Sequence, residues 1–274
     1  SSDVCSSDLG FGQKGPKALR PAYAPIVHAA SGFDLAQVGY QGGGRPANTA
    51  TFIADVFGGM SAFGAIQTAL LTRTKTGRGQ FIDVALLDGM LNLLVYECQE
   101  AQAPSDEKVR VYQPLRSTDG YVVTAPTSQR NFEILARAIG HAEWLEDPRF
   151  RRTREREANW GELMDLIETW TSQRTGQQCE DELLAAGVPC TRYRTVAEAL
   201  ADPQLAERGS LTRIKDPAGS YWVPGASFQM PGLNTAPRNR VAQLNEDTAD
   251  VLGSVLGYSA EQAQACAGTG ATGH

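Results

Sequence analysis

The spacing of apolar and polar residues in the first half of the chain predicts two helices with a strand between them. Apolar residues recur near helical spacing across 57–74, and the segment ends in the glycine-rich turn TGRG at 76–79. A short run at 80–84 predicts a strand, and the apolar segment 86–98 predicts a second, largely buried helix. We therefore expect a hydrophobic core around these elements.

The flanking segments have different patterns. Segment 10–48 is rich in Gly and Pro and predicts loops around one short helix near 25–30. The polar run EAQAPSDEKVR at 100–110 predicts a linker. Beyond it we expect strands at 121–125 and 188–193, helices at 129–139, 149–170, 175–186, 195–201, 246–256 and 260–266, and a β-hairpin of 210–215 and 219–223. The linker is the expected domain boundary.

Composition narrows the classes of function. A hydrophobic share of 42% with 20% charged residues is ordinary for a globular protein. The formal net charge of −6 does not favour a nucleic-acid partner. We find no apolar run near the roughly 20 residues that span a bilayer, and no secretory signal. We expect a cytoplasmic protein without a membrane segment.

The metal-binding residue types are scattered. Outside the first nine residues the cysteines show no CxxC spacing, and the three histidines lie far apart: Cys98, Cys179, Cys190, Cys266, His28, His141 and His274. We expect reduced thiols and no metal site. Two matches to GxGxxG, at 10–15 and 268–273, lack the flanking strand and helix that a dinucleotide site requires.

The first nine residues, SSDVCSSDL, include VCSSDL, which one reading frame of a common sequencing adapter encodes. We expect residues 1–9 to be an adapter artefact and the native sequence to begin near Gly10. The chain also lacks an initiator Met. We therefore expect an N-terminally truncated protein.

Asp55 is the candidate catalytic residue. It stands just before the pair Gly58 and Gly59, at the expected start of the helix. One interpretation is a helix cap, the commonest role of Asp at such a position. The other is a nucleophile: a carboxylate is ionised at neutral pH and attacks a thioester without a general base. The Gly58 and Gly59 amides would then stabilise the oxyanion.

Motifs along the chain favour the second interpretation. They are GFGQKGP at 10–16, AYAPIVHAASG at 22–32, RPAN at 45–48, ADVFGGM at 54–60, RTKTGRGQFIDVALLDG at 73–89, STDGYV at 117–122, DPRF at 147–150, AGVPC at 186–190 and DPQLAERG at 202–209. In this order they resemble the class III CoA-transferases, the family of formyl-CoA transferase, carnitine CoA-transferase and α-methylacyl-CoA racemase.

The resemblance implies an α/β fold. Segments 10–99 and 203–274 would form a Rossmann-like large domain, incomplete because its N-terminal part is missing. Segment 100–111 would be the linker, and 112–202 a smaller α+β domain. The family forms an interlocked homodimer.

The resemblance also implies a reaction. Asp55 would form a covalent acyl intermediate while CoA moves from an acyl-CoA donor to a small carboxylic acid acceptor. Coenzyme A thioester would be a substrate, and no cofactor would be bound permanently. Residues Tyr23, Arg20 and His28 would be candidates for substrate or CoA binding, and the packed or solvated alternative stays open for each.

Two other functions stay open. Racemases of the family carry His at the position of Tyr23, and Tyr is poorly suited to proton abstraction near neutral pH, so Tyr23 favours transfer. A non-catalytic CoA-binding paralogue is the second alternative. The chain also departs from the transferases at 97–111, where no glycine corresponds to their active-site glycine run. The donor and acceptor acids are not identified by the sequence.

Overall fold

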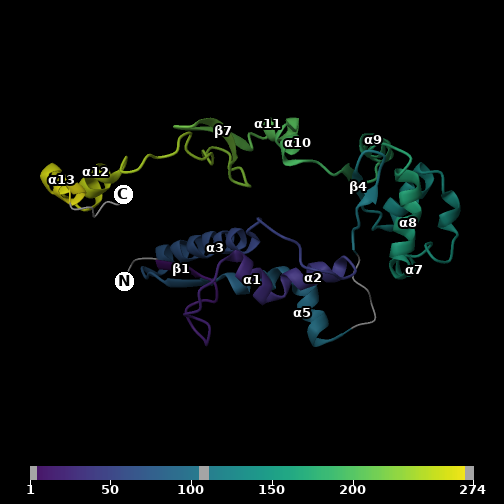
Figure 1. Cartoon of the computed structure of the whole chain (residues 1–274), viewed down its shortest axis with the longest axis horizontal. Helices are drawn as coiled ribbons and strands as arrows, with labels where there is room; N and C mark the ends of the chain where they lie inside the picture. The colour runs from purple at the N-terminus through teal and green to yellow at the C-terminus, as the bar shows by residue number, and fades with distance from the viewer. Residues whose placement is uncertain (1–4, 105–110, 269–274) are drawn as a thin grey trace. The chain divides into compact units, whose positions relative to one another are not determined.

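The computed structural model describes residues 5–104 and 111–268, with side chains from residue 10 to 266 outside that gap (Figure 1). Contacts between Cα atoms divide the chain into two compact units, Ser1–Arg192 and Tyr193–His274. Helices and strands mix in both units, so the expected α/β class is confirmed. The Rossmann-like layout and the interlocked dimer stay predictions.

The first unit begins with a parallel pair of strands separated by helices. Its elements are β1 (Cys5–Leu9), α1 (Ala24–Ser31), α2 (Phe33–Tyr40), α3 (Ile53–Thr76), β2 (Phe81–Ala85), α4 (Leu86–Leu93) and α5 (Val95–Gln102). Strand β1 pairs with β2 in parallel, from Cys5 opposite Phe81 to Leu9 opposite Ala85. A parallel pair needs a long crossover, and α1 to α3 supply it.

Strand β1 lies inside the segment 1–9 that the sequence marks as foreign. Ladder hydrogen bonds join backbone groups, so they form with little regard to side-chain identity. The pairing therefore does not test the origin of residues 1–9, which stays a prediction. Helix α2 is an addition to the expected pattern, because segment 10–48 predicts only one short helix.

A small core joins α1, α3 and α4. Its buried members are Ala24, Val27, Ala54, Leu86 and Met90. The loop before α1 packs tightly on it: a Cβ on Gly10 would lie 2.4 Å from the Ala22 Cβ, so glycine is required there. This core fixes the beginning of α3.

Helix α3 begins at Ile53, four residues before the expected start at 57. It ends at Thr76, and Gly77 follows in the left-handed conformation with φ 68°. Its 24 residues have the length and apolar composition of a membrane-crossing helix, which corrects the expectation that no segment would. Length and composition alone are weak grounds for a membrane span, since helices of soluble proteins also meet them.

The rest of the first unit is a helical layer on a small sheet. Its elements are β3 (Leu115–Arg116), β4 (Tyr121–Thr124), α6 (Gln129–Ala138), the 3-10 turn η1 (Ala142–Leu145), α7 (Thr153–Ala158), α8 (Trp160–Thr171), α9 (Gly176–Ala186) and β5 (Cys190–Arg192). The strands are antiparallel in the order β3-β4-β5. A second core, which includes Phe132, Leu163 and Ile167, lies among these helices and strands.

The second unit carries a β-hairpin and short helices. Its elements are α10 (Val196–Leu200), α11 (Pro203–Glu207), β6 (Leu211–Asp216), β7 (Gly219–Pro224), α12 (Thr248–Asp250), the π-helical turn η2 (Val251–Val255) and α13 (Ala260–Gly268). The hairpin turns at 216–219, where the Asp216 carboxylate accepts the Ala218 and Gly219 N–H groups at 2.8 and 2.9 Å. This confirms the hairpin expected from the sequence.

The domain limits expected from the sequence differ from the compact units. Helix α5 continues to Gln102 inside the expected linker, and residues 105–110 lie outside the described ranges. The second unit begins at Tyr193, within the segment 112–202 expected to form the smaller domain. The assignment of 10–99 and 203–274 to one large domain stays a prediction.

Candidate functional site

Asp55 is the third residue of α3 and lies in its first turn. Its side chain is exposed. In the described parts of the chain its carboxylate has no hydrogen bond and no ion pair. It is therefore not the side-chain cap of this helix, whose N-cap residue is Phe52. The partial positive charge of the helix N-terminus favours an anion here.

The backbone next to Asp55 is held by His28. The His28 ring is 1% exposed, and its Nε2 accepts the Ala54 N–H at 3.1 Å. On another side the ring meets Phe33, with centroids 5.7 Å apart. This agrees with the packed or capping alternative for His28. A role in CoA binding is not tested by the geometry.

Gly58 and Gly59 lie within α3, as the expected helix 57–74 also placed them. Helical geometry points their N–H groups at the carbonyls of Ala54 and Asp55. The two glycines follow Asp55 at spacings of three and four residues, so they share its face of the helix. A Cβ on Gly59 would meet no atom within 4 Å. Gly58 is buried, so the open position beside Asp55 is at Gly59. The role of both glycines as oxyanion donors stays a prediction.

Arg20 and Tyr23 lie in and after the loop that precedes α1. The Arg20 guanidinium is 5.8 Å from the centroid of the Phe11 ring, and Lys17 Nζ is 5.6 Å from it. Tyr23 is the N-cap residue of α1 and its side chain is 80% exposed, so it is not a packed aromatic in this chain. Among the described residues, no hydrogen bond or ion pair joins Arg20 or Tyr23 to Asp55. The structure brings His28, but not these two, into contact with the turn that carries Asp55.

Two further carboxylates each bind a distant segment of the first unit. The sequence analysis predicted neither of these contacts. Asp83 on β2 accepts the Gln13 N–H at 3.0 Å and so fixes the GFGQKGP loop. Glu97 on α5 accepts a hydrogen bond from Tyr40 on α2, which raises the pKa of Tyr40 to about 12. The residues of each pair are far apart in sequence, so no local spacing signals them.

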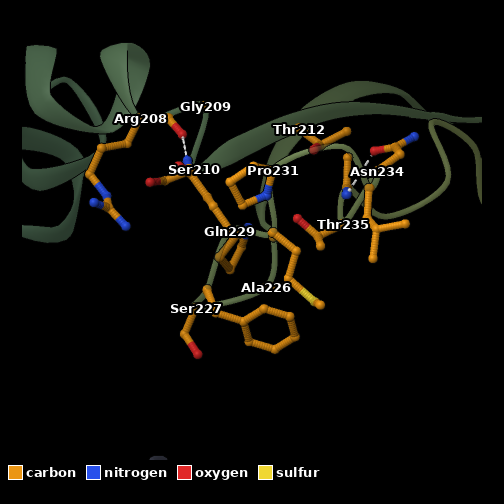
Figure 2. A pocket seen from close by; sticks show the side chains of 16 residues that line it. Arg208, Gly209, Ser210, Thr212, Ala226, Ser227, Gln229, Pro231, Asn234 and Thr235 are labelled. Carbon is orange, nitrogen blue, oxygen red and sulfur yellow. Dashed lines mark hydrogen bonds between the residues drawn. The ribbon is translucent and has the colours of Figure 1, made fainter.

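A cavity of about 610 Å³ lies in the second unit (Figure 2). It is lined by residues 208–210, Thr212, 224–231 and 233–236, and Gln229 donates a hydrogen bond to the Arg208 carbonyl at its edge. None of the predicted site residues lines it, and Arg208 is the charged side chain among those that do. Because the cavity holds no pair of titratable groups, it is not the candidate catalytic centre. Within the described ranges, no three His, Cys, Asp or Glu side chains converge as metal ligands.

The mixed α/β scaffold agrees with what the family comparison shows. The model of CoA-transferase family III matches residues 4–248. The chain therefore belongs to CoA-transferase family III.

Two relatives of this chain bear the names of CoA-transferases. Acetyl-CoA:oxalate CoA-transferase of Acetobacter aceti is 32% identical over 240 residues, which cover 84% of this chain and 60% of the relative. Human succinyl-CoA:glutarate CoA-transferase is 25% identical over 269 residues, covering 93% of this chain and 60% of the relative. The chain thus spans about 60% of the length of these relatives.

Solved structures share the fold. A CAIB/BAIF family protein from Brucella suis is 30% identical, with a TM-score of 0.71, and the match covers 92% of this chain and 68% of that one. Rv3272 from M. tuberculosis has a TM-score of 0.76 at 22% identity, with 89% of this chain and 67% of that one covered. The second likeness concerns the fold alone.

Proposed function

We propose that the protein moves CoA from an acyl-CoA donor to a small carboxylic acid through a covalent intermediate on Asp55. Family membership and the names of the relatives support CoA transfer. The observation that carries the role of Asp55 is its exposed carboxylate in the first turn of α3, with no partner among the described residues and with two glycines on the same helix face.

The chemistry balances without a further reactant. An Asp55 oxygen attacks the thioester carbonyl, the C–S bond breaks, and a mixed anhydride and CoA thiolate form. The thiolate attacks the aspartyl carbonyl, so the donor acid leaves and an aspartyl-CoA thioester remains. The acceptor carboxylate then attacks this thioester and releases the thiolate again. Attack of the thiolate on the acceptor's carbonyl gives the new acyl-CoA and restores the Asp55 carboxylate.

The first turn of α3 assists the attack. Its partial positive charge stabilises the oxyanion that forms as Asp55 attacks. The open position at Gly59 would let an acyl group approach Asp55. Arg20 and Tyr23, on the loop before α1, are proposed CoA and substrate contacts. Coenzyme A is a substrate here, and we propose no permanently bound cofactor.

Racemisation is the weaker alternative. It needs a base that reaches the α-proton of the substrate, and a histidine suits this task near neutral pH. The histidine near Asp55 is His28, but its ring is 1% exposed and its Nε2 already accepts the Ala54 N–H. No observation on this chain favours racemisation over transfer.

The test uses the full-length protein, incubated with a panel of acyl-CoAs and quenched with hydroxylamine. We expect a hydroxamate on the peptide that contains Asp55, and turnover at the level of an enzyme-free control in Asp55→Ala and Asp55→Asn. Asp34→Asn is the matched control, because Asp34 lies in the first turn of the neighbouring helix α2. Full turnover by either Asp55 variant would refute the assignment. CoA binding without any acylation would favour the non-catalytic paralogue.

A further inference from the structure

Helix α3 has an unusual partner at its N-terminus. The first N–H groups of any α-helix lack acceptors within the helix, and a side chain at the N-cap commonly supplies one. The N-cap residue here, Phe52, has no such side chain. The Ala54 N–H is accepted instead by His28 Nε2, from a residue 26 positions earlier in the chain.

This contact determines the state of the imidazole. Because the Ala54 N–H donates, Nε2 carries the lone pair, and the proton of the neutral ring lies on Nδ1. Nδ1 is buried and has no hydrogen-bond partner among the described residues. An unsatisfied buried donor is destabilising, so its presence calls for a compensating role.

The ring is held firmly enough to fix the backbone that it contacts. It projects from α1, whose residues Ala24 and Val27 are fully buried in the core shared with α3 and α4. Ala54, whose N–H donates to the ring, is also fully buried, and the next residue is Asp55. The apolar pattern alone predicts a helix that starts at 57, beyond Asp55. The early start at Ile53 is therefore a tertiary effect to which His28 contributes.

We propose that His28 is a positioning residue for Asp55. By accepting the Ala54 N–H, it keeps the first turn of α3 helical, so that the Asp55 carboxylate stands at the helix N-terminus on the face of Gly58 and Gly59. Without this acceptor the turn opens and Asp55 becomes part of a loop. The inference rests on the proposed nucleophilic role of Asp55 for its effect on catalysis. Its effect on the helix is independent of that role.

Two substitutions in the full-length protein separate hydrogen bonding from packing. His28→Leu fills much of the same space without an acceptor, whereas His28→Gln offers an amide oxygen to the Ala54 N–H. We expect His28→Leu to slow hydroxylamine-trapped acylation of Asp55 by roughly 10- to 100-fold, as displaced catalytic groups do. The KM for acyl-CoA should change little, and His28→Gln should recover most of the rate. Equal rates in Leu and Gln variants of matched thermal stability would overturn the proposal.

Hydrogen exchange provides a readout that does not depend on activity. We expect amides of the peptide spanning 53–57 to exchange faster in His28→Leu than in the wild type, and His28→Gln to restore their protection. Unchanged protection in His28→Leu would overturn the proposal. If the wild type forms no hydroxamate on Asp55, the proposed function fails, while exchange still decides the role of His28. If His28→Leu does not fold, His28→Met replaces it in both measurements.

Discussion

At the scale of single residues, Asp119 shows how one carboxylate fixes the start of a helix. Its Oδ1 accepts the Gly176 N–H at 2.7 Å and the Ser117 hydroxyl at 3.0 Å. These bonds, the Gly176 N–H first, lower the pKa of Asp119 below its ordinary value of 3.8. A Cβ on Gly176 would lie 3.0 Å from the Arg192 Cβ, so α9 begins in a tightly packed place.

The sign of the pH effect follows from this lowered pKa. A carboxyl group whose pKa is lower in the folded state stabilises the fold above its unfolded pKa, and this stability is lost as the pH falls through the folded value. We expect Asp119→Ala to lower the melting temperature at pH 6, and the difference from the wild type to shrink as the pH is brought below 3.8. Thermal melts across this range check it. Asp181→Ala on the same helix is the control, and a constant difference at every pH would contradict the argument.

At the scale of elements, α7 depends on a buried cation. The Arg156 side chain is 1% exposed, and its guanidinium lies 4.4 Å from the centroid of the Phe132 ring. Its Nη1 donates to the Phe150 carbonyl at 2.9 Å and to Gln129 Oε1 at 3.0 Å. Arg156 belongs to the charged run 149–157, whose charges alone would suggest a solvated position, yet its side chain is buried. The residue joins α7 to α6 and to the turn before it.

Replacing Arg156 with Met keeps an apolar stem but removes every donor. We expect a loss of about 2–3 kcal/mol in the free energy of unfolding, because the Phe150 carbonyl is left buried without its partner. Urea unfolding measures the change. The control is Arg152→Met, since the Arg152 side chain is 73% exposed and its ion pair with Glu155 is 3.9 Å long. We expect the control to change stability by less than about 0.5 kcal/mol. Equal losses in the two variants would contradict the role of burial.

At the scale of the whole molecule, the described chain leaves much of α3 uncovered. Val56, Met60 and Leu71 are 64%, 62% and 60% exposed. A contiguous apolar face of this kind is usually covered in the working protein. Two things could cover this face of α3: a segment that corresponds to the part of the relatives not matched by this chain, or a second copy of the chain.

We expect the full-length protein to be a homodimer, as the family resemblance implies. We also expect it to be cytoplasmic and so to stay in the supernatant without detergent. Sedimentation velocity at micromolar concentration checks the mass, and fractionation of cell extracts checks the location. A monomer at these concentrations would contradict the dimer. Recovery with the membrane fraction would contradict the location and assign the exposed face of α3 to lipid.

Elements whose signals are local were predictable from the sequence. The hairpin of β6 and β7 turns where expected, because Asp216 bonds to N–H groups two and three residues away. Helix α9 begins after Thr175, whose side chain forms a capping box with Gln178, and ends at Gly187. The candidate Asp55 was also visible, from its place before two glycines and from the family motifs.

Tertiary structure decided the features whose partners are distant in sequence. The beginning of α3 depends on His28, 26 residues before Ala54, and the tie between α2 and α5 joins Tyr40 to Glu97, 57 residues apart. Residue spacing within one segment carries no information on such pairs, because they form only when separate elements pack. The sequence by itself therefore determined the family and the candidate nucleophile. Packing decided that Asp55 stands in the first turn of a helix and not ahead of it, because a buried imidazole accepts the N–H group that its own helix leaves without a partner.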